Sequence, residues 1–398
     1  MTVPLIALID LDAFFAQIEQ YETPEYRGQP VIIGGKPGGR GVVSTASYEA
    51  RIFGVHSAMP INMAHRLCPD GIYLRSDMAK YTEYSKRICE VLYNITPVVD
   101  QASVDEFYLD LSGMERLAGT PRELGLRCKE LIKEQIGLTC SIGIGPNRLI
   151  AKLASEYRKP DGLTIVNSGQ VQQFLDPLPL KALRGVGKKT LARIAKLNVT
   201  TVGQLRQRYT LIELQQAVGE QTGGSLYHQA RGNYQARRVS HKSRKSISKE
   251  TTFSADVSDQ QQLKKTMQRL AFNVARSLRK KEFRGDVITI RVRLADFTTS
   301  TRQRKLSEPI DSDVDIARIG WELFELNGYK DKSLRLIGIG VVIADEKNTN
   351  DESEKTQMDL FSVPGMESKG AENEGDEVVT AIDEILNKFG EDSIRRGG

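Results

Sequence analysis

The segment that decides the fold lies at the start of the chain and reads Pro4-Leu5-Ile6-Ala7-Leu8-Ile9-Asp10-Leu11-Asp12-Ala13-Phe14-Phe15. Its first six residues form a short, continuous apolar run, which predicts a strand buried on both faces. The residues that follow, Ala13 to Gln20, predict a helix. Asp12 stands where the N-cap of that helix belongs, and we favour capping over metal binding for it. Asp10 therefore lies at the end of a buried strand.

The composition excludes several classes of protein. The chain has 398 residues, 39% of them hydrophobic, so we expect two to four globular domains. Its longest apolar runs, Val3–Ile9 and Leu336–Ala344, are far shorter than the roughly 20 residues of a membrane span. The N-terminus lacks the basic start of a signal peptide. We therefore expect no contact with a membrane and a cytoplasmic location.

The candidate metal ligands are carboxylates. The chain has four cysteines and four histidines, all scattered, which excludes a disulfide framework, a zinc ribbon and a histidine metal site. Asp10 ends the first strand, and Asp105-Glu106 lies at the turn of a predicted hairpin. Such oxygen ligands suit Mg²⁺. A solvated turn is the alternative for Asp105-Glu106.

The charge is unevenly distributed. The net charge is only +5, but residues 345–398 hold 15 Asp/Glu and 6 Lys/Arg, which leaves residues 1–344 with a net charge of +14. A strongly basic body favours a polyanionic partner such as nucleic acid. The acidic tail, 345–398, is poor in aromatic residues and typical of disorder.

The order of the predicted elements indicates an α+β domain around an antiparallel sheet, interrupted by a small insertion at residues 21–77. The insertion contains a glycine-rich loop at 34–39 and a helix at 46–53. The other predicted elements are a helix at 78–94, two strand-like runs within 98–111, a helix at 123–135, a strand at 138–144 and a helix at 147–156.

The second half of the chain has three parts before the tail. Residues 167–230 are predicted to be helical. Residues 231–249 carry seven Lys/Arg and no Asp/Glu, which indicates an extended basic linker. Residues 250–344 follow the order βαββαβ. Their strand at 287–296 alternates apolar residues with Thr289, Arg291 and Arg293, so we expect one buried face and one basic face.

Five segments resemble the successive motifs of the Y-family DNA polymerases, and the resemblance covers about residues 4–361. They are Ile9–Phe15, Tyr48–Val55, Ser103–Asp110, Ser141–Asn147 and Lys159–Gly162. The resemblance implies a right-hand polymerase: a palm at 1–20 and 78–166, fingers at 21–77, a thumb at 167–230, a linker at 231–249 and a DNA-binding little finger at 250–344.

The resemblance also implies the catalytic site. Asp10, Asp105 and Glu106, with the backbone carbonyl of Leu11, would hold two Mg²⁺ ions. Because adjacent residues of a regular strand point to opposite faces, Asp105 and Glu106 must lie where a turn breaks the alternation.

Other residues match the positions at which the family binds the incoming nucleotide. Tyr48, Arg51 and Lys159 match the residues that hold the triphosphate, and they supply a hydroxyl, a bidentate fork and a point charge. Thr45, one helical turn before Glu49, would add a contact, although a surface threonine is the alternative. Phe15 matches the steric gate, an aromatic ring that excludes the ribose 2′-hydroxyl; without the resemblance it would be a core aromatic. Val42 and Ser44 match the small residues above the nascent base pair.

Three further segments point to partners. Gly185, Gly187 and Lys188 belong to a segment that resembles the helix-hairpin-helix of the family's thumb, where the backbone approaches a DNA phosphate. Arg291 and Arg293 would face DNA from the little finger. Gln357-Met358-Asp359-Leu360-Phe361 is similar to peptides that dock on the sliding clamp, with Gln357, Leu360 and Phe361 as the contacts. Met358 replaces the more usual Leu, and 37 residues follow Phe361.

Together these features predict a low-fidelity, template-directed DNA polymerase for translesion synthesis. It would act as a monomer on primer-template DNA and deoxynucleoside triphosphates, by two-metal phosphoryl transfer and without proofreading. Two alternatives stay open: a nucleotidyl cyclase with a similar palm, and a non-catalytic, clamp-associated DNA-binding scaffold. Primer extension distinguishes them.

Overall fold

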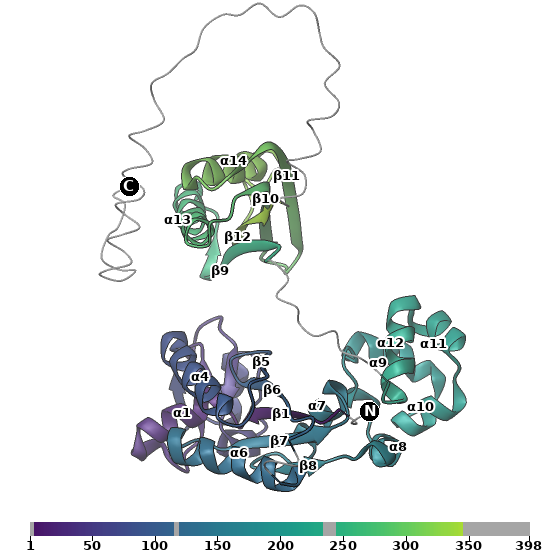
Figure 1. Cartoon of the computed structure of the whole chain (residues 1–398). Helices are drawn as coiled ribbons and strands as arrows, with labels where there is room; N and C mark the ends of the chain where they lie inside the picture. The colour runs from purple at the N-terminus through teal and green to yellow at the C-terminus, as the bar shows by residue number, and fades with distance from the viewer. Residues whose placement is uncertain (1–3, 115–118, 234–243, 345–398) are drawn as a thin grey trace, which may run out of the picture. The chain divides into compact units, whose positions relative to one another are not determined.

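The computed structural model of the chain describes residues 4–114, 119–233 and 244–344 (Figure 1). The chain divides into two compact units, residues 1–241 and 242–398. Each unit is described by itself below.

The first unit is built on a mixed sheet of five strands in the order β5-β6-β1-β7-β8. The central strand β1 (Ile6–Leu11) is antiparallel to β6 (Glu106–Asp110) and to β7 (Cys140–Gly145). At the edges, β5 (Val99–Gln101) is antiparallel to β6, and β8 (Leu163–Ile165) is parallel to β7. The prediction of an antiparallel sheet is confirmed except at β8, a three-residue strand that was not predicted.

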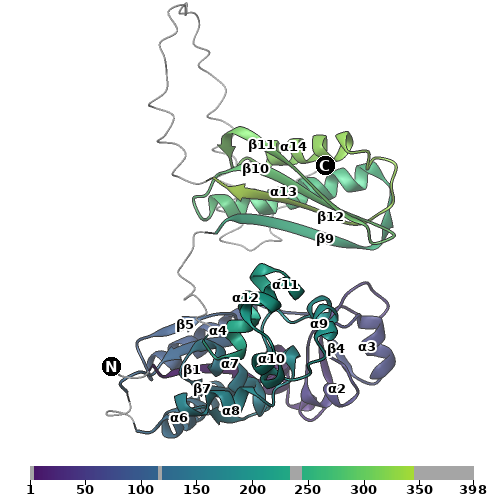
Figure 2. The same ribbon diagram turned by 90° about the vertical axis from the view of Figure 1, so that its right-hand side faces the viewer.

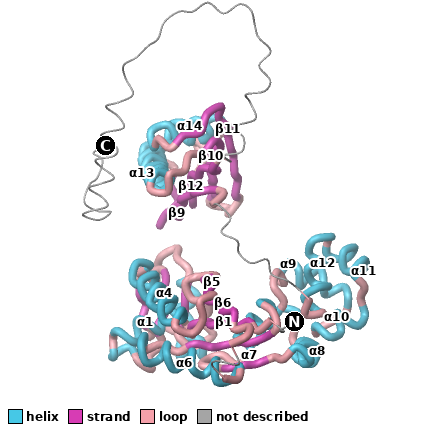
Figure 3. Tube along the Cα trace, viewed as in Figure 1, coloured by secondary structure: helices cyan, strands magenta, loops and turns pink. Residues whose placement is uncertain are grey.

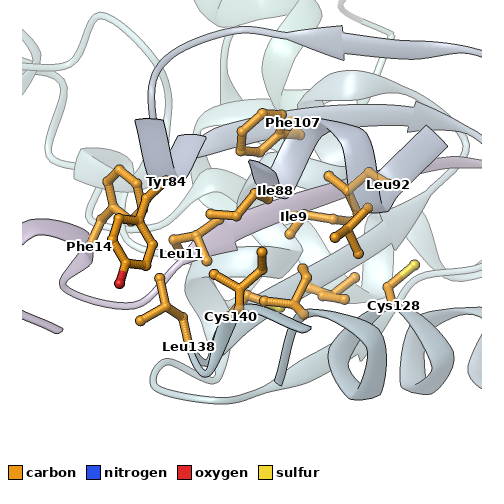
Figure 4. Close-up of a cluster of buried hydrophobic side chains, with 14 of the residues drawn as sticks. Ile9, Leu11, Phe14, Tyr84, Ile88, Leu92, Phe107, Cys128, Leu138 and Cys140 are labelled. Atoms are coloured by element: carbon orange, nitrogen blue, oxygen red, sulfur yellow. The ribbon is translucent and has the colours of Figure 1, made fainter. Parts of the chain in front are cut away.

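Helices cover both faces of this sheet. Side chains of α1 (Phe14–Glu22), α4 (Met78–Tyr93) and α6 (Pro121–Ile136) bury one face in the main core (Figure 4). Ile9 and Leu11 belong to that core, whereas Leu8 faces the other side and packs with Ala151 of α7 (Arg148–Tyr157). The first strand is thus buried on both faces, as predicted.

The insertion after α1 forms a small sheet of its own in the order β3-β2-β4. Its elements are η1 (Pro24–Tyr26), β2 (Val31–Gly34), β3 (Val43–Ala46), α2 (Tyr48–Ile52), α3 (Ile61–Leu67) and β4 (Ile72–Leu74). Figure 2 shows α2, α3 and β4 grouped together at one end of the unit. The predicted helix begins at Tyr48 rather than at residue 46, because the Ser47 side chain caps it by accepting from the Ala50 N–H. The three strands were not predicted.

Residues 167–230 are mostly helical, as predicted, and form an apolar core together with side chains of α7. The elements are η2 (Ser168–Gln170), α8 (Val171–Leu175), η3 (Leu180–Ala182), α9 (Lys188–Ile194), η4 (Ala195–Leu197), α10 (Val202–Arg208), α11 (Leu211–Val218) and α12 (Glu220–Ala230).

The second unit has the predicted βαββαβ order. Its elements are β9 (Ser246–Val257), α13 (Gln260–Arg279), β10 (Gly285–Leu294), β11 (Thr299–Ile310), α14 (Asp313–Leu326) and β12 (Leu334–Ile343). The sheet order is β11-β10-β12-β9, and both helices lie on one side of it (Figure 3). Ile288, Ile290 and Val292 are buried beneath them, which confirms the predicted alternation in β10.

The predicted linker boundary is wrong at its C-terminal end. The first strand of the second unit begins at Ser246, so residues 246–249 of the expected linker pair with β12. Residues 234–243 of that linker, and the whole of the expected tail 345–398 with its peptide 357–361, lie outside the described residues. Across the described part of the chain, every helix is too short or too polar to cross a membrane.

Candidate active site

The carboxylates predicted to act together lie on neighbouring strands. Asp10 of β1 is directly opposite Glu106 of β6 in the antiparallel register. Asp105 lies in the turn before β6, where its carbonyl oxygen accepts from the Leu11 N–H at 3.0 Å. The turn therefore does break the strand alternation between Asp105 and Glu106, as the sequence required. Asp10 is only 3% exposed, so its charge needs close partners.

Two lysines supply those partners. The Lys152 ammonium lies 2.9 Å from Oδ2 of Asp10 and 2.8 Å from Oε1 of Glu106, and it also pairs with Glu156 at 2.8 Å. The Lys159 ammonium lies 2.5 Å from Oδ1 of Asp10. Burial alone would lower the pKa of Lys152, but the three carboxylates raise it above its ordinary value. Lys152 is therefore a fixed positive charge in the site.

Sequence reasoning missed Lys152. A signal was present, because Lys152 and Glu156 are four residues apart on one helix that directly follows a strand of the sheet. That spacing alone is equally typical of a solvated surface pair. Only the packing of α7 across β1 turns Lys152 toward the two carboxylates.

The donor set fits a hard divalent cation. Asp10 and Glu106 already share one positive charge, the Lys152 ammonium, and carboxylate oxygens are the ligands that Mg²⁺ prefers. The third carboxylate, Asp105, instead accepts from the Ser103 hydroxyl at 2.5 Å. Within the described residues, no group of three or more His, Cys, Asp or Glu side chains stands close enough to hold a metal as it is. Among the described residues, Asp10, Asp105 and Glu106 are therefore not gathered into a ready-made ligand set.

The capping prediction for Asp12 is wrong. Ala13 occupies the N-cap position of α1, with φ 44°, and no side chain caps the helix. Asp12 is 1% exposed and accepts hydrogen bonds from the side chains of Ser141 at 2.7 Å and Thr139 at 3.2 Å. It also accepts from the backbone N–H of Asp161 at 2.9 Å and from the hydroxyl of Tyr48 at 3.5 Å.

The predicted triphosphate ligands come from two places. Tyr48 and Arg51 lie on α2, with the Arg51 guanidinium 4.5 Å from the centre of the Tyr48 ring. Lys159 comes from the loop after α7 and meets Asp10. Burial, with a smaller effect from Asp12, raises the pKa of Tyr48 to about 12. Tyr48 therefore stays protonated at neutral pH and can donate to a phosphate oxygen.

Thr45 was expected one helical turn before Glu49, but it lies on strand β3, paired with Ile33. Ser44 of the same strand and Val42 before it are exposed, at the edge of the small sheet. Thr45 is in extended backbone because the helix starts later: Ser47 is its N-cap and Tyr48 its first residue.

Phe15 lies in the first turn of α1 and is half-buried. Its ring stacks on Tyr81 of α4 with centroids 4.2 Å apart and an interplanar angle of 10°. The Tyr81 hydroxyl is itself fixed by a 2.8 Å hydrogen bond to Glu19. One face of the Phe15 ring is thus packed against the core.

The residues expected to contact DNA are exposed to different degrees. Gly187 is the N-cap of α9, Lys188 is its first residue, and Gly185 has φ +81°. No atom lies within 4 Å of the position that a Cβ would take at either glycine, so the backbone there is open to a ligand. In the second unit, Arg291 pairs with Glu250 at 3.2 Å, and Arg293 donates to the Thr299 hydroxyl at 2.8 Å.

Comparison with known families gives three matches along the chain. The impB/mucB/samB family matches residues 9–156, and the C-terminal domain of that family matches residues 244–360. The DNA polymerase-iota thumb domain matches residues 181–233.

Curated proteins similar to the chain share one name. A DNA polymerase IV of Treponema denticola is 40% identical over 354 residues, which cover 89% of this chain and 87% of that protein. A DNA polymerase IV of Listeria monocytogenes is 38% identical, covering 84% of this chain and 93% of that protein.

Solved structures are similar as well. A Y-family DNA polymerase chimera of Dbh and Dpo4 has a TM-score of 0.75 at 26% identity, covering 85% of this chain and 98% of the chimera. An insertion ternary complex of Dbh DNA polymerase has a TM-score of 0.60 at 26% identity, covering 86% of this chain and all of that one.

Proposed function

The chain belongs to the Y family of DNA polymerases, and on that premise we propose that it copies damaged templates by adding deoxynucleotides at the site around Asp10 and Glu106. As a DNA-directed DNA polymerase it needs a primer 3′-hydroxyl, an incoming triphosphate and a way to stabilise the charge that develops between them. The cyclase and scaffold interpretations lose their support, because the relatives named above are DNA polymerases.

One observation carries the proposal. Asp10 and Glu106 lie opposite each other and share the Lys152 ammonium, and Lys159 from the loop after α7 also pairs with Asp10. Two Mg²⁺ ions held by Asp10, Asp105, Glu106 and the Leu11 carbonyl would activate the primer hydroxyl and neutralise the leaving pyrophosphate. The chain's own residues bind and orient the substrates.

Lys159 is the residue that changes partner. In the structure its ammonium pairs with Asp10. A triphosphate is a stronger anionic partner than one carboxylate, so Lys159 would release Asp10 and bind the phosphate oxygens, with Arg51 and the Tyr48 hydroxyl beside it. Asp10 would then be free to bind a cation. Nucleotide binding and completion of the carboxylate site are coupled through this lysine.

Primer-template DNA is the proposed second substrate. The open backbone at Gly185 and Gly187, the exposed Lys188 and the basic face at Arg291 and Arg293 suit phosphate contacts. We further propose that the chain acts as a monomer and docks on a sliding clamp through Gln357, Leu360 and Phe361. The match of the family's C-terminal domain runs to residue 360 and so includes most of this peptide.

The test is primer extension by the purified full chain on a defined template with Mg²⁺. The expected result is incorporation of the complementary nucleotide opposite both intact and damaged template bases. A primer with a mismatched 3′ end should be extended or left alone but never shortened, because the proposal includes no proofreading. Nucleotide addition that ignores the template, or removal of the mismatched end, would contradict the proposal.

A further inference from the structure

Asp12 is buried beside the carboxylate site, and the proposed function gives it no role. It is 1% exposed, and both of its oxygens are fully engaged. Oδ1 accepts from Ser141 at 2.7 Å and from Tyr48 at 3.5 Å, while Oδ2 accepts from Asp161 N–H at 2.9 Å and from Thr139 at 3.2 Å. All four donors are neutral groups, so Asp12 is a structural acceptor rather than a partner for a cation.

The four donors come from three separate parts of the first unit. Thr139 and Ser141 flank the start of β7, next to β1. Asp161 belongs to the loop between α7 and β8, and Tyr48 to α2 of the insertion. One carboxylate therefore ties a loop and a helix to the central sheet.

The loop that Asp12 holds is the one that carries Lys159. Asp161, two residues later, has φ 54° and donates its N–H to Asp12. Its side chain is held by Lys129 at 2.5 Å, and the next N–H, of Gly162, reaches the Ser141 hydroxyl at 3.4 Å. A backbone N–H can only donate, so this turn needs an acceptor at the place where Asp12 stands.

We propose that Asp12 is a positioning residue for the incoming nucleotide, an inference that rests on the proposed function. It fixes the Lys159 loop through the Asp161 N–H and orients the Tyr48 hydroxyl. Two triphosphate-binding side chains are thereby held in place before the nucleotide arrives, so that less conformational freedom is lost on binding. The hydrogen bond to Asp161 is the stronger link, and the longer one to Tyr48 is the weaker.

The test compares Asp12→Asn with the wild-type chain in single-nucleotide incorporation. The amide keeps the size of the side chain but removes the charged acceptor, and its NH₂ group cannot accept from any donor. The KM for the deoxynucleotide should rise at least about tenfold, the effect of losing a hydrogen bond to a charged group, while kcat and DNA affinity change much less. A second readout avoids turnover: nucleotide-dependent capture of the chain on a dideoxy-terminated primer should weaken by the same factor.

Two further variants distinguish positioning from mere folding support. Thr139→Val removes the hydrogen bond to Asp12 and another from Gln17, but it leaves those from Tyr48 and the Asp161 N–H to Asp12 in place, so it should lower the midpoint of thermal unfolding and leave the KM unchanged. In a Lys159→Ala background, Asp12→Asn should raise the KM by less than it does in the wild type, because part of its effect passes through Lys159.

The outcomes separate the two proposals. Two results would contradict the positioning role while leaving the proposed function intact. In one, the wild type is active and Asp12→Asn has the same KM. In the other, Asp12→Asn raises the KM by the same factor in the wild type and in the Lys159→Ala background. A wild-type chain without templated incorporation contradicts the proposed function, and the positioning role with it.

Discussion

Asp10 and Asp12 lie two residues apart at the end of one strand, yet their carboxylates have opposite surroundings. The oxygens of Asp10 face two ammonium groups, that of Lys152, which also pairs with Glu106, and that of Lys159, which a bound triphosphate is proposed to draw away. Those of Asp12 face hydroxyls and a backbone N–H, which are fixed by the sheet and the following loop. An aspartate therefore forms ion pairs that can be exchanged at position 10, and hydrogen bonds that fix the following loop at position 12. Nothing in the local sequence distinguishes the two, since the distinction comes from β7 and from the loop after α7.

The residue scale also carries the prediction for sugar selection. We propose that Phe15 is the steric gate, so losing the ring that stacks on Tyr81 in Phe15→Ala should open the space beside the nucleotide sugar. The ratio of ribonucleotide to deoxyribonucleotide incorporation should rise by about 10- to 200-fold, the range by which a pocket discriminates one group the size of a methylene. Competing incorporation of the two nucleotides on one template measures it.

Phe14→Leu is the matched control, because Phe14 is buried in the main core instead. It should lower stability and leave the sugar preference unchanged. An unaltered preference in Phe15→Ala would remove Phe15 from the role of gate.

At the scale of elements, the position of Lys152 depends on how closely α7 packs on β7. Gly143 of β7 makes this possible: a Cβ there would stand 2.0 Å from the carbonyl oxygen of Ala151, which belongs to the helix backbone and cannot rotate away. Gly143→Ala should therefore push α7 off the sheet and destabilise the chain by about 1–3 kcal/mol.

Thermal unfolding measures this prediction, with Gly169→Ala as the control because no atom lies within 4 Å of its added Cβ. Nucleotide incorporation by Gly143→Ala should fall as well, since the helix carries Lys152. Equal unfolding midpoints for Gly143→Ala and Gly169→Ala would show that α7 tolerates the shift.

Elements differ in how far the sequence predicts them. The apolar run before Asp10, the hairpin turn at Asp105 and the alternation in β10 have one dominant physical signal each, and the structure agrees with all three. Strands β2, β3 and β4 are short and are stabilised by pairing with one another. No pattern in the local sequence predicts such pairing. Asp12 was misassigned for a related reason: a capping residue and a buried acceptor have the same local sequence, and only the distant donors decide.

The site shows the same division. The strand end at Asp10 and the turn at Asp105-Glu106 were predictable from local patterns, but their assignment as metal ligands came from the family resemblance, because a hairpin turn alone is equally typical of solvated residues. Lys152 was not, because an i, i+4 pair with Glu156 carries no information about which face of α7 meets the sheet. The orientation of Asp105 toward Ser103 is likewise a tertiary detail.

At the scale of the whole molecule, charge separates the basic residues 1–344 from the acidic residues 345–398. A chain truncated after Ala344 should keep its DNA affinity and a steep dependence of that affinity on salt, because the phosphate contacts are retained. Stimulation of its synthesis by a sliding clamp should be lost, because residues 357–361 are removed. A salt titration of DNA binding and primer extension with and without clamp measure both effects. Loss of most DNA affinity, or undiminished stimulation, would overturn this division of roles.

The central claim is that templated nucleotide addition takes place at the carboxylates of β1 and β6. Its most direct test is single-turnover incorporation by Asp105→Asn, with DNA binding measured in parallel. Asp70→Asn, at an exposed turn before β4 in the same unit, is the matched control. We predict that Asp105→Asn incorporates nucleotide more than about 100-fold more slowly than the wild type but binds DNA equally well. A loss of that size is larger than the effect of removing a residue that only supports a metal ligand. Incorporation at the wild-type rate by Asp105→Asn would contradict the claim.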